Sequence, residues 1–427
     1  MKKITILIPK IKPPDISDIV TTQIENILLE LNNQFTLNVV WLIFQPSPFS
    51  DYSFKNYKIV DYHKYDDAVD VIDKIQPDLI INEVRLGING ICFGISANYK
   101  KIPNITITPT GKSEFFSTNF STKSNFQLIF SDKVIADVSK NKPKKFAMLK
   151  YSIHRYGFLL KSLKNSGYGF IDILKFIFFY PRFQISSKTY PALHKITSGT
   201  LNFCFNEHWF KRLLDAKFNK STLILVGDPA FDDLCEENQN STNAKFDSNK
   251  TRILFCPTPM HEHGWLTKVE EDELILKIIK EVKSHPQFDI SLKIHPSSSS
   301  YHEYELLLKS LNQPITLFQK ENIMSLLKEF DVMLTYGSSN VILNGILSKT
   351  PVVLFNFNDK NKLSRLNDSK IIKECNDVTE LYSQLSSMKN PISKEILENY
   401  IKLQIGTFDG KNSQRIAKHI EKLIRSN

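Results

Sequence analysis

Short apolar runs alternate with segments of helical periodicity from the start of the chain to about residue 108. The apolar runs have the length of buried β-strands, and the segments between them repeat apolar residues at i, i+3 and i+4, as amphipathic helices do. The expected strands are 4–9, 37–44, 77–83 and 102–108, and the expected helices are 18–31 and 66–75. Strands that alternate with helices predict a parallel, doubly wound sheet.

The same alternation returns in the second half of the chain. Strands are expected at 252–258, 288–295, 314–318, 331–336 and 351–357, helices at 270–283, 301–311, 321–330 and 339–348, and a last helix at 414–427. The polar run 235–251 has the composition of a linker. The sequence therefore predicts an α/β protein with two Rossmann-like domains, 1–234 and 252–427. We expect a cleft between the carboxyl ends of their sheets, with the last helix packing back across it.

Length and composition agree with two domains. The chain has 427 residues, 41% hydrophobic and 23% charged, which is enough apolar material for a core in each domain.

No apolar run is long enough for a transmembrane helix, and the first run ends at Pro9, too early for a secretory signal. The five cysteines are widely spaced without a C-x-x-C pair, which predicts neither a zinc site nor disulfides. These features favour a cytoplasmic protein.

The net charge of +10 is concentrated in one segment. Residues 139–190 hold eleven lysines and arginines and one acid, Asp172. This segment lies within 113–195, where the alternation stops and basic, aromatic and aliphatic residues are mixed, so we expect a helical insertion in the first domain. Such a mixture suits a helix on an anionic membrane surface, at the inner face of the membrane. A solvated face over ordinary core helices is the alternative. Nucleic-acid binding is not expected, because no RNA-recognition motif accompanies the charge.

One strand end of the second domain carries a histidine that could handle a charged ligand. The strand at 288–295 ends in Lys293-Ile294-His295-Pro296, and ligands of doubly wound sheets bind outside the carboxyl ends of the strands. An imidazole there can donate a hydrogen bond to a phosphate oxygen or act as a general acid. A surface histidine in a turn is the alternative. The dipeptide alone is not specific, because His285-Pro286 is a helix stop signal.

A second strand end offers an anion-binding turn. The strand at 331–336 continues into Gly337, Ser338 and Ser339, and a helix with Asn340 in its first turn then begins. The glycine permits close backbone approach, and hydroxyls and helix N-terminal amides donate hydrogen bonds to anions. A simple helix N-cap is the alternative. Because both loops end strands of one parallel series, we expect them to converge on one pyrophosphate.

These motifs resemble those of GT-B-type transferases of surface-polymer synthesis, the group of CDP-glycerol glycerophosphotransferases and capsule sialyl- or Kdo-type transferases. The group combines a strand ending in K-x-H-P, a D-x-x-x-x-x-x-S-S strand and loop, and a strand beginning with a small residue and P-[VI]-[VI]. The matching segments here are 293–296, 331–339 and 349–353. The segment 225–234, LVGDPAFDDL, resembles the motif that closes the N-terminal domain in this group and in UDP-GlcNAc 2-epimerases.

The resemblance implies that the second domain binds a nucleotide-activated donor, with His295 at the phosphate, Ser338 and Ser339 around it, and no tightly bound cofactor. The implied reaction moves a glycosyl or glycerophosphoryl group from a CMP-, CDP- or UDP-linked donor to a cell-surface polysaccharide, a teichoic-acid-like polymer or a lipid-linked acceptor. The helix after the serines departs from the group, since it carries Asn340 and Asn344 where an acid is usual. A non-hydrolysing UDP-GlcNAc 2-epimerase is the first alternative, and a non-catalytic scaffold is the second.

Two further loops hold candidates for acid–base chemistry. His261 lies in PMHEHGW (259–265), after the first strand of the second series. His261 and His263 could share a metal ion, but no third ligand is indicated, so we expect His261 to act in the cleft without a metal. Glu83 ends the third strand of the first domain and is a candidate general base for an acceptor hydroxyl. A solvated loop acid is the alternative for Glu83.

Overall fold

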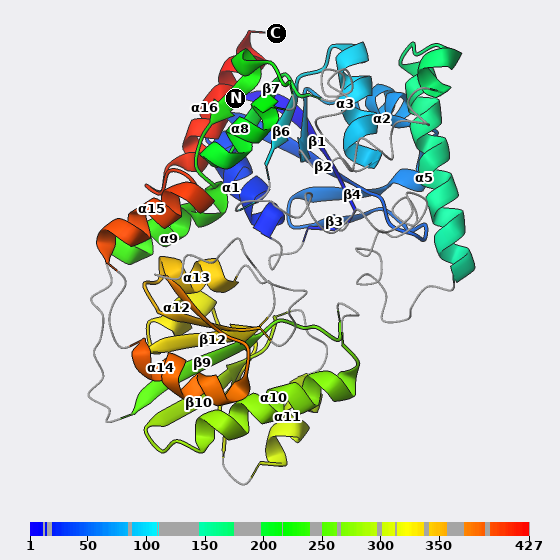
Figure 1. The fold of residues 1–427 in the computed structure, drawn as a ribbon. Helices are drawn as coiled ribbons and strands as arrows, with labels where there is room; N and C mark the ends of the chain where they lie inside the picture. Colours follow the sequence, from blue (N-terminus) through cyan, green and yellow to red (C-terminus); the bar gives the residue numbers. More distant parts are fainter. Residues whose placement is uncertain are drawn as a thin grey trace. The chain divides into compact units, whose positions relative to one another are not determined.

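The chain folds into two units, each built around its own sheet (Figure 1). One unit comprises Met1–Asp233 with Lys402–Asn427, and the other comprises Leu234–Ile401. The structure, a computed structural model, describes residues 1–11, 13–14, 19–83, 88–108, 110, 145–174, 198–215, 217–239, 250–262, 266–296, 301–311, 314–336, 341–356, 371–388 and 393–426.

The first unit contains an eight-stranded sheet in the order β3-β4-β2-β1-β5-β6-β7-β8. The strands are parallel except for the pair of β3 and β4. Their bounds are β1 (Lys2–Lys10), β2 (Phe35–Ile43), β3 (Tyr52–Phe54), β4 (Tyr57–Asp61), β5 (Leu79–Glu83), β6 (Asn104–Ile107), β7 (Leu201–Cys204) and β8 (Leu223–Leu225). The chain winds from β1 outward through β2 to β4 and then crosses to β5. The topological switch point therefore lies between β1 and β5.

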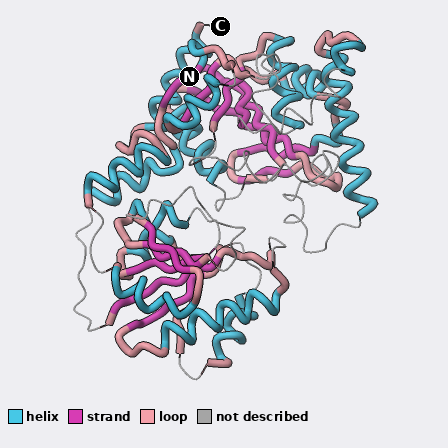
Figure 2. The backbone as a smooth tube through the Cα atoms, viewed as in Figure 1, coloured by secondary structure: helices cyan, strands magenta, loops and turns pink. Residues whose placement is uncertain are grey.

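Helices cover both faces of this sheet (Figure 2). Ile4, Ile6 and Ile8 of β1 share a core with α1 and α16, whereas Leu7 shares another core with α2, α3 and α5. This division follows from the strand geometry, because successive side chains point to opposite faces. Among its described residues, the unit includes the helical segments α1 (Ile19–Asn32), η1 (Tyr62–Lys64), α2 (Ala68–Ile75), α3 (Ile88–Lys100), α5 (Lys145–Asn165), α8 (Glu207–Asp215), η3 (Lys220–Thr222), η4 (Pro229–Phe231), α9 (Asp232–Gln239), which runs on into the second unit, and α16 (Asn412–Arg425).

The second unit contains a six-stranded parallel sheet in the order β11-β10-β9-β12-β13-β14. Its strands are β9 (Thr251–Pro257), β10 (Phe288–Lys293), β11 (Leu317–Phe318), β12 (Val332–Tyr336), β13 (Val352–Phe355) and β14 (Ile372–Cys375). Its helical segments are α10 (Lys268–Lys283), α11 (Tyr301–Lys309), α12 (Ile323–Leu327), α13 (Val341–Leu347), η6 (Val378–Glu380), α14 (Leu381–Ser387) and α15 (Lys394–Gln404), which ends in the first unit. The winding reverses between β9 and β12. The predicted pair of doubly wound, Rossmann-like sheets is confirmed.

The end of the chain belongs to the first unit, whereas the sequence placed it in a domain spanning 252–427. Residues Lys402–Asn427 return to the first sheet, where α16 lies beside α1 (Figure 1). Ile416 and Ile420 of α16 are fully buried in one core with Ile24 of α1. This shared apolar core accounts for the return of the chain. The expected position of this helix across a cleft stays a prediction.

The predicted linker and insertion are described only in part. Of the linker 235–251, residues up to Gln239 are helical as the end of α9, residues 240–249 lie outside the described residues, and β9 begins at Thr251. Of the basic insertion 113–195, the structure describes 145–174. That part contains the helix α5, as the sequence predicts, and α5 packs into the core that α2 and α3 share.

The GDPAFDD segment fixes α16 to the first unit. The Asp232 carboxylate accepts hydrogen bonds from the backbone N of Asn412 at 3.1 Å and the backbone N of Ser413 at 2.7 Å, and from both side chains. It therefore satisfies free amides in the first turn of α16. A Cβ at Gly227 would lie 2.0 Å from the carbonyl oxygen of Thr407, so this close approach requires glycine.

A second buried carboxylate of this segment joins the segment to two other parts of the unit. Asp228 accepts hydrogen bonds from Thr110 Oγ1 at 2.7 Å, Gln23 Nε2 at 3.0 Å and the backbone N of Ala230 at 3.0 Å. These donors come from the end of β6, from α1 and from η4. Burial raises the pKa of the Asp228 carboxyl to about 6.

The stability of the first unit should therefore depend on the protonation of Asp228. Its pKa of about 6 in the folded protein exceeds the ordinary 3.8, so protonation favours the folded state and the contribution to stability increases as pH falls through this window. Relative to Asp228→Asn, the wild-type free energy of unfolding should rise by about 1 kcal/mol between about pH 7 and pH 5. Urea unfolding of both proteins at the two pH values measures this change. The other titrating groups are present in both proteins, so their contributions cancel in the comparison. If the two proteins differed by the same free energy of unfolding at both pH values, the assignment would be contradicted.

Candidate functional site

The carboxyl edge of the second sheet gathers the strand ends from which the predicted donor loops start. β10 and β12 are the two parallel neighbours of β9, so their carboxyl ends lie on either side of the carboxyl end of β9. Lys293, His295 and Pro296 lie at the end of β10, and Tyr336 ends β12. The predicted turn of Gly337, Ser338 and Ser339 and the predicted binding residue after it, Asn340, lie outside the described residues. The roles of these residues stay predictions.

His295 is half-buried and Pro296 is exposed. Both lie directly after the end of β10, which hydrogen bonds hold in place. The backbone N of Ile294 donates to the carbonyl oxygen of Phe318 at 3.0 Å. The preceding residue, Lys293, is buried, and its ammonium donates to the carbonyl oxygens of Gln319 at 2.6 Å and Ile294 at 3.2 Å. Burial lowers the pKa of Lys293. The structure therefore shows Lys293 holding the turn after β11 against β10, and its contact with a nucleotide stays a prediction.

The ends of β9 and β12 are bonded to each other through side chains. Thr258 Oγ1 donates to the carbonyl oxygen of Tyr336 at 2.7 Å, and Thr335 Oγ1 donates to the carbonyl oxygen of Cys256 at 2.6 Å. Thr258 and Thr335 are buried. These bonds fix the geometry of the switch point in the second sheet.

Sequence reasoning missed Glu271, a buried carboxylate beside this switch point. Glu271 lies in the first turn of α10, next to the capping box of Thr267 and Glu270, and is 1% exposed. Its carboxylate accepts a hydrogen bond from the backbone N of Met260 at 2.7 Å. Burial raises the pKa of this carboxyl. A signal was available, because Glu271 lies four residues before Ile275 on the apolar face of the helix.

His261 lies in the loop after β9. Its side chain is exposed, with Nδ1 at 3.4 Å from the carbonyl oxygen of Leu266, and its backbone N lies 3.4 Å from Glu271 Oε1. His263 lies outside the described residues. Across the described parts of the chain, no three His, Cys, Asp or Glu side chains are grouped to hold a metal ion.

Asn356 is another polar residue at this edge that sequence reasoning missed. It follows β13 and is 5% exposed, and its backbone N donates to the carbonyl oxygen of Cys375 at 2.8 Å. Among the residues that the structure describes, none accepts a hydrogen bond from its buried side-chain Nδ2. Because buried amides are usually bonded, this donor makes Asn356 a candidate residue at this edge. No periodic or motif signal in the sequence distinguishes it from a structural asparagine.

In the first unit, Glu83 lies at the topological switch point. It ends β5, is half-buried, and forms an ion pair with Lys10, which ends β1. These are the two strands between which the winding reverses, so the pair stands where doubly wound sheets bind ligands. The sequence predicted that Glu83 ends a strand, but it indicated neither the switch point nor the ion pair with Lys10. Its role as a general base stays a prediction.

Asp331, part of the family-like pattern, lies at the opposite edge of the second sheet. Its carboxylate accepts a hydrogen bond from the backbone N of Arg252 at 2.8 Å and pairs with the guanidinium of that residue at 3.3 Å. Asp331 precedes β12 and Arg252 lies near the start of β9. This aspartate therefore joins the amino ends of the two strands whose carboxyl ends flank the switch point.

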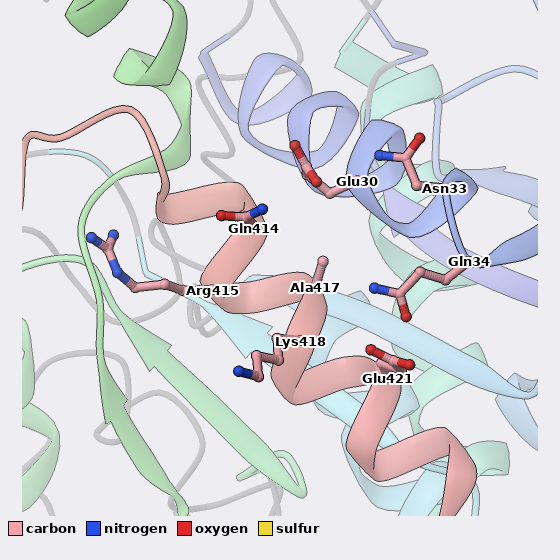
Figure 3. A pocket seen from close by; sticks show the side chains of 8 residues that line it. All are labelled: Glu30, Asn33, Gln34, Gln414, Arg415, Ala417, Lys418 and Glu421. Atoms are coloured by element: carbon pink, nitrogen blue, oxygen red, sulfur yellow. The ribbon is translucent and has the colours of Figure 1, made fainter.

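Two pockets of the first unit lie away from its switch point. A groove of about 600 Å³ runs between the end of α1 and α16 (Figure 3). The residues lining this groove are Glu30, Asn33, Gln34, Gln414, Arg415, Ala417, Lys418 and Glu421.

The second pocket, of about 250 Å³, lies beside η1 and α5 and contains His63 and His154, whose rings stack at 5.0 Å. His63 Nδ1 lies 2.7 Å from Asp61 Oδ1, and burial lowers the pKa of His154. Sequence reasoning missed both histidines, because they meet only through packing of α5.

Comparison with known proteins connects this arrangement to solved structures alone. No family model matches the sequence, and no curated protein matches it. The UDP-GlcNAc 2-epimerase of Neisseria meningitidis, bound to UDP-GlcNAc, is similar with 15% identity and a TM-score of 0.53 over 98% of this chain and 100% of that one. The S. aureus MnaA–UDP structure has 12% identity and a TM-score of 0.52 over 100% and 97%. The glycotransferase of kitacinnamycin has 12% identity and a TM-score of 0.55 over 99% and 100%.

These similarities extend over nearly the whole length of each chain, so they concern both units. At such low identity they establish the fold alone. The chain has a GT-B-like α/β fold with two parallel-sheet domains.

Proposed function

We propose that this chain is a GT-B-type transferase. It would move a glycosyl or glycerophosphoryl group from a CMP-, CDP- or UDP-linked donor to a cell-surface polysaccharide, a teichoic-acid-like polymer or a lipid-linked acceptor. The observation that carries the proposal is the second sheet, whose switch-point strand β9 has the K-x-H-P strand end on one side and the strand leading to Gly337 on the other. Similar solved structures include a complex with UDP and one with UDP-GlcNAc.

The chemistry follows from the groups at the two switch points. His295 would donate a hydrogen bond to a donor phosphate oxygen, and Ser338 and Ser339 would donate others. In glycosyl transfer, a base such as Glu83 takes the proton of the acceptor hydroxyl as its oxygen bonds to the sugar carbon. The bond from that carbon to the phosphate oxygen breaks, and the electron pair stays with the departing nucleotide. Catalysis would rest mainly on orientation and on stabilisation of that charge.

A UDP-GlcNAc 2-epimerase is the second candidate, because several similar structures are such epimerases. The described helix after the serine turn, α13, has the sequence VILNGIL and carries no carboxylate. An epimerase moves a proton at a sugar carbon and benefits from acids in its site. Because the transferase group also usually carries an acid on this helix, the composition of α13 departs from both candidates, and the reaction itself has to separate them.

Calorimetric titration and thermal shift with CMP, CDP, UDP and UDP-GlcNAc test the proposal. We expect at least one nucleotide to bind, with a stabilisation of about 2.7 kcal/mol at a ligand concentration one hundred times Kd. Formation of a UDP-sugar isomer from UDP-GlcNAc, followed by NMR, would contradict the transferase and support the epimerase. Absence of binding by all four would support a non-catalytic scaffold.

His295→Ala should weaken binding of the same nucleotide about 30-fold, or about 2 kcal/mol, because a hydrogen bond to a charged phosphate is lost. His285→Ala is the matched control, since it removes the other His-Pro histidine, which precedes β10 and lies 3.5 Å from Glu281. That control should bind as the wild type does. Unchanged affinity in His295→Ala would refute the role of this histidine.

We also propose that the basic segment 139–190, within the insertion, binds the anionic inner face of a membrane. Among the described residues, no helix is long and apolar enough to cross a membrane. Phe170 and Ile171, after α5, are 75% and 67% exposed, and Ile153 on α5 is 60% exposed. Exposed apolar side chains within a basic segment are typical of interfacial binding.

Neutralising four lysines of this segment should abolish co-sedimentation with phosphatidylglycerol vesicles, since each lysine contributes about 1 kcal/mol near an anionic surface. Four exposed lysines of α10 and α16 serve as the control set, and their neutralisation should leave sedimentation intact. Equal loss with both sets would show a general charge effect and refute the assignment. The test lysines are Lys140, Lys142, Lys144 and Lys145, and the control lysines are Lys277, Lys280, Lys418 and Lys422.

A further inference from the structure

We propose that Glu271 is a positioning residue of the nucleotide site, which fixes the loop after β9 relative to the end of β12. The inference rests on the proposed function, because it concerns the site where the second unit would hold its donor. Glu271 itself would not touch the nucleotide. Its carboxylate would act through the two chain segments that it joins.

The location of this carboxylate is unusual for a surface helix. Glu271 is 1% exposed on the same face of α10 as Ile275 and Ile278, which are fully buried. A carboxylate in such a place loses its hydration and is tolerated only when hydrogen bonds replace it. The neighbouring Glu270 already supplies the capping box of this helix. Glu271 is therefore not needed for capping, and its bonds lead elsewhere.

Its bonds lead to the two strand ends at the switch point. The single oxygen Oε1 accepts from the backbone N of Met260 at 2.7 Å, while the backbone N of His261 and the hydroxyl of Tyr336 each lie at 3.4 Å. The Met260 N also donates to the carbonyl oxygen of Thr258 at 2.8 Å. Thr258 in turn donates to the carbonyl oxygen of Tyr336 at 2.7 Å. These contacts form a closed ring through the β9 loop, the end of β12 and α10.

Each strand end held by this ring leads directly to a predicted contact residue. Tyr336 is the last residue before Gly337, and Met260 is the last residue before His261. One buried oxygen thus sets the starting point of two segments that a nucleotide at this edge would meet. Loss of the acceptor would release the loop while leaving the sheet intact, because the β9–β12 pairing does not involve Glu271.

The test compares variants that keep or remove the acceptor. Glu271→Gln keeps Oε1, and we expect its Kd for UDP, CDP or CMP, whichever binds the wild type, to stay within about 3-fold. Glu271→Met has a similar size without an acceptor, and its Kd should rise at least about 10-fold. Tyr336→Phe removes one contact and should give a smaller rise. Asp331→Asn is the control, since this carboxylate also accepts a backbone N–H of the same sheet, at the opposite edge; its Kd should be unchanged.

Hydrogen exchange of residues 258–262 provides a second readout that does not require a ligand. Exchange of the Met260 and His261 amides should be faster in Glu271→Met than in the wild type, with no change along β10. If a folded Glu271→Met binds the nucleotide with the wild-type Kd, the inference about Glu271 is overturned, but the proposed function is not. An equal loss of affinity in Asp331→Asn would have the same consequence. If Glu271→Met fails to fold, unchanged Kd in Tyr336→Phe would overturn it. Absence of nucleotide binding by the wild type would instead overturn the proposed function on which it rests.

Discussion

Parallel strand pairing is the constraint on which the rest of this structure depends. Every described pair of neighbouring strands except β3 and β4 is parallel, so each connection between parallel strands must cross a face of the sheet and return to the same edge. The loops after the strands therefore collect at the carboxyl edges. The reversals of winding, between β1 and β5 and between β9 and β12, place Glu83 beside Lys10 and Thr258 beside Tyr336. The candidate chemistry lies at these two positions because of topology.

Buried carboxylates then join segments that the sheets leave separate. Asp232 holds the start of α16, Asp228 binds donors from α1 and the end of β6, and Glu271 links two strand ends of the second unit. Each loses hydration on burial, and hydrogen bonds from backbone amides and hydroxyls compensate for it. Such residues set the relative positions of the segments that they join.

The fold is shared by epimerases and a glycotransferase, so it does not by itself select a reaction. Selection must come from side chains at the strand ends. The described helix α13 carries no carboxylate, and this concerns how a donor sugar is held. Glu83 forms an ion pair with Lys10, and this concerns which group is available to accept a proton.

The sequence by itself determined the two series of strands and helices, because apolar periodicity is a local property of the chain. It also located His295 and Glu83 at strand ends. It did not reveal β3, β4 or β14, which are short and mix polar with apolar residues. Only the tertiary structure decided the strand order, the return of α16 and the hydrogen-bond partners of Lys293 and Glu271. These depend on contacts between distant residues, such as Asp232 and Asn412, which are 180 positions apart. No local pattern encodes which distant donor a buried acid will meet.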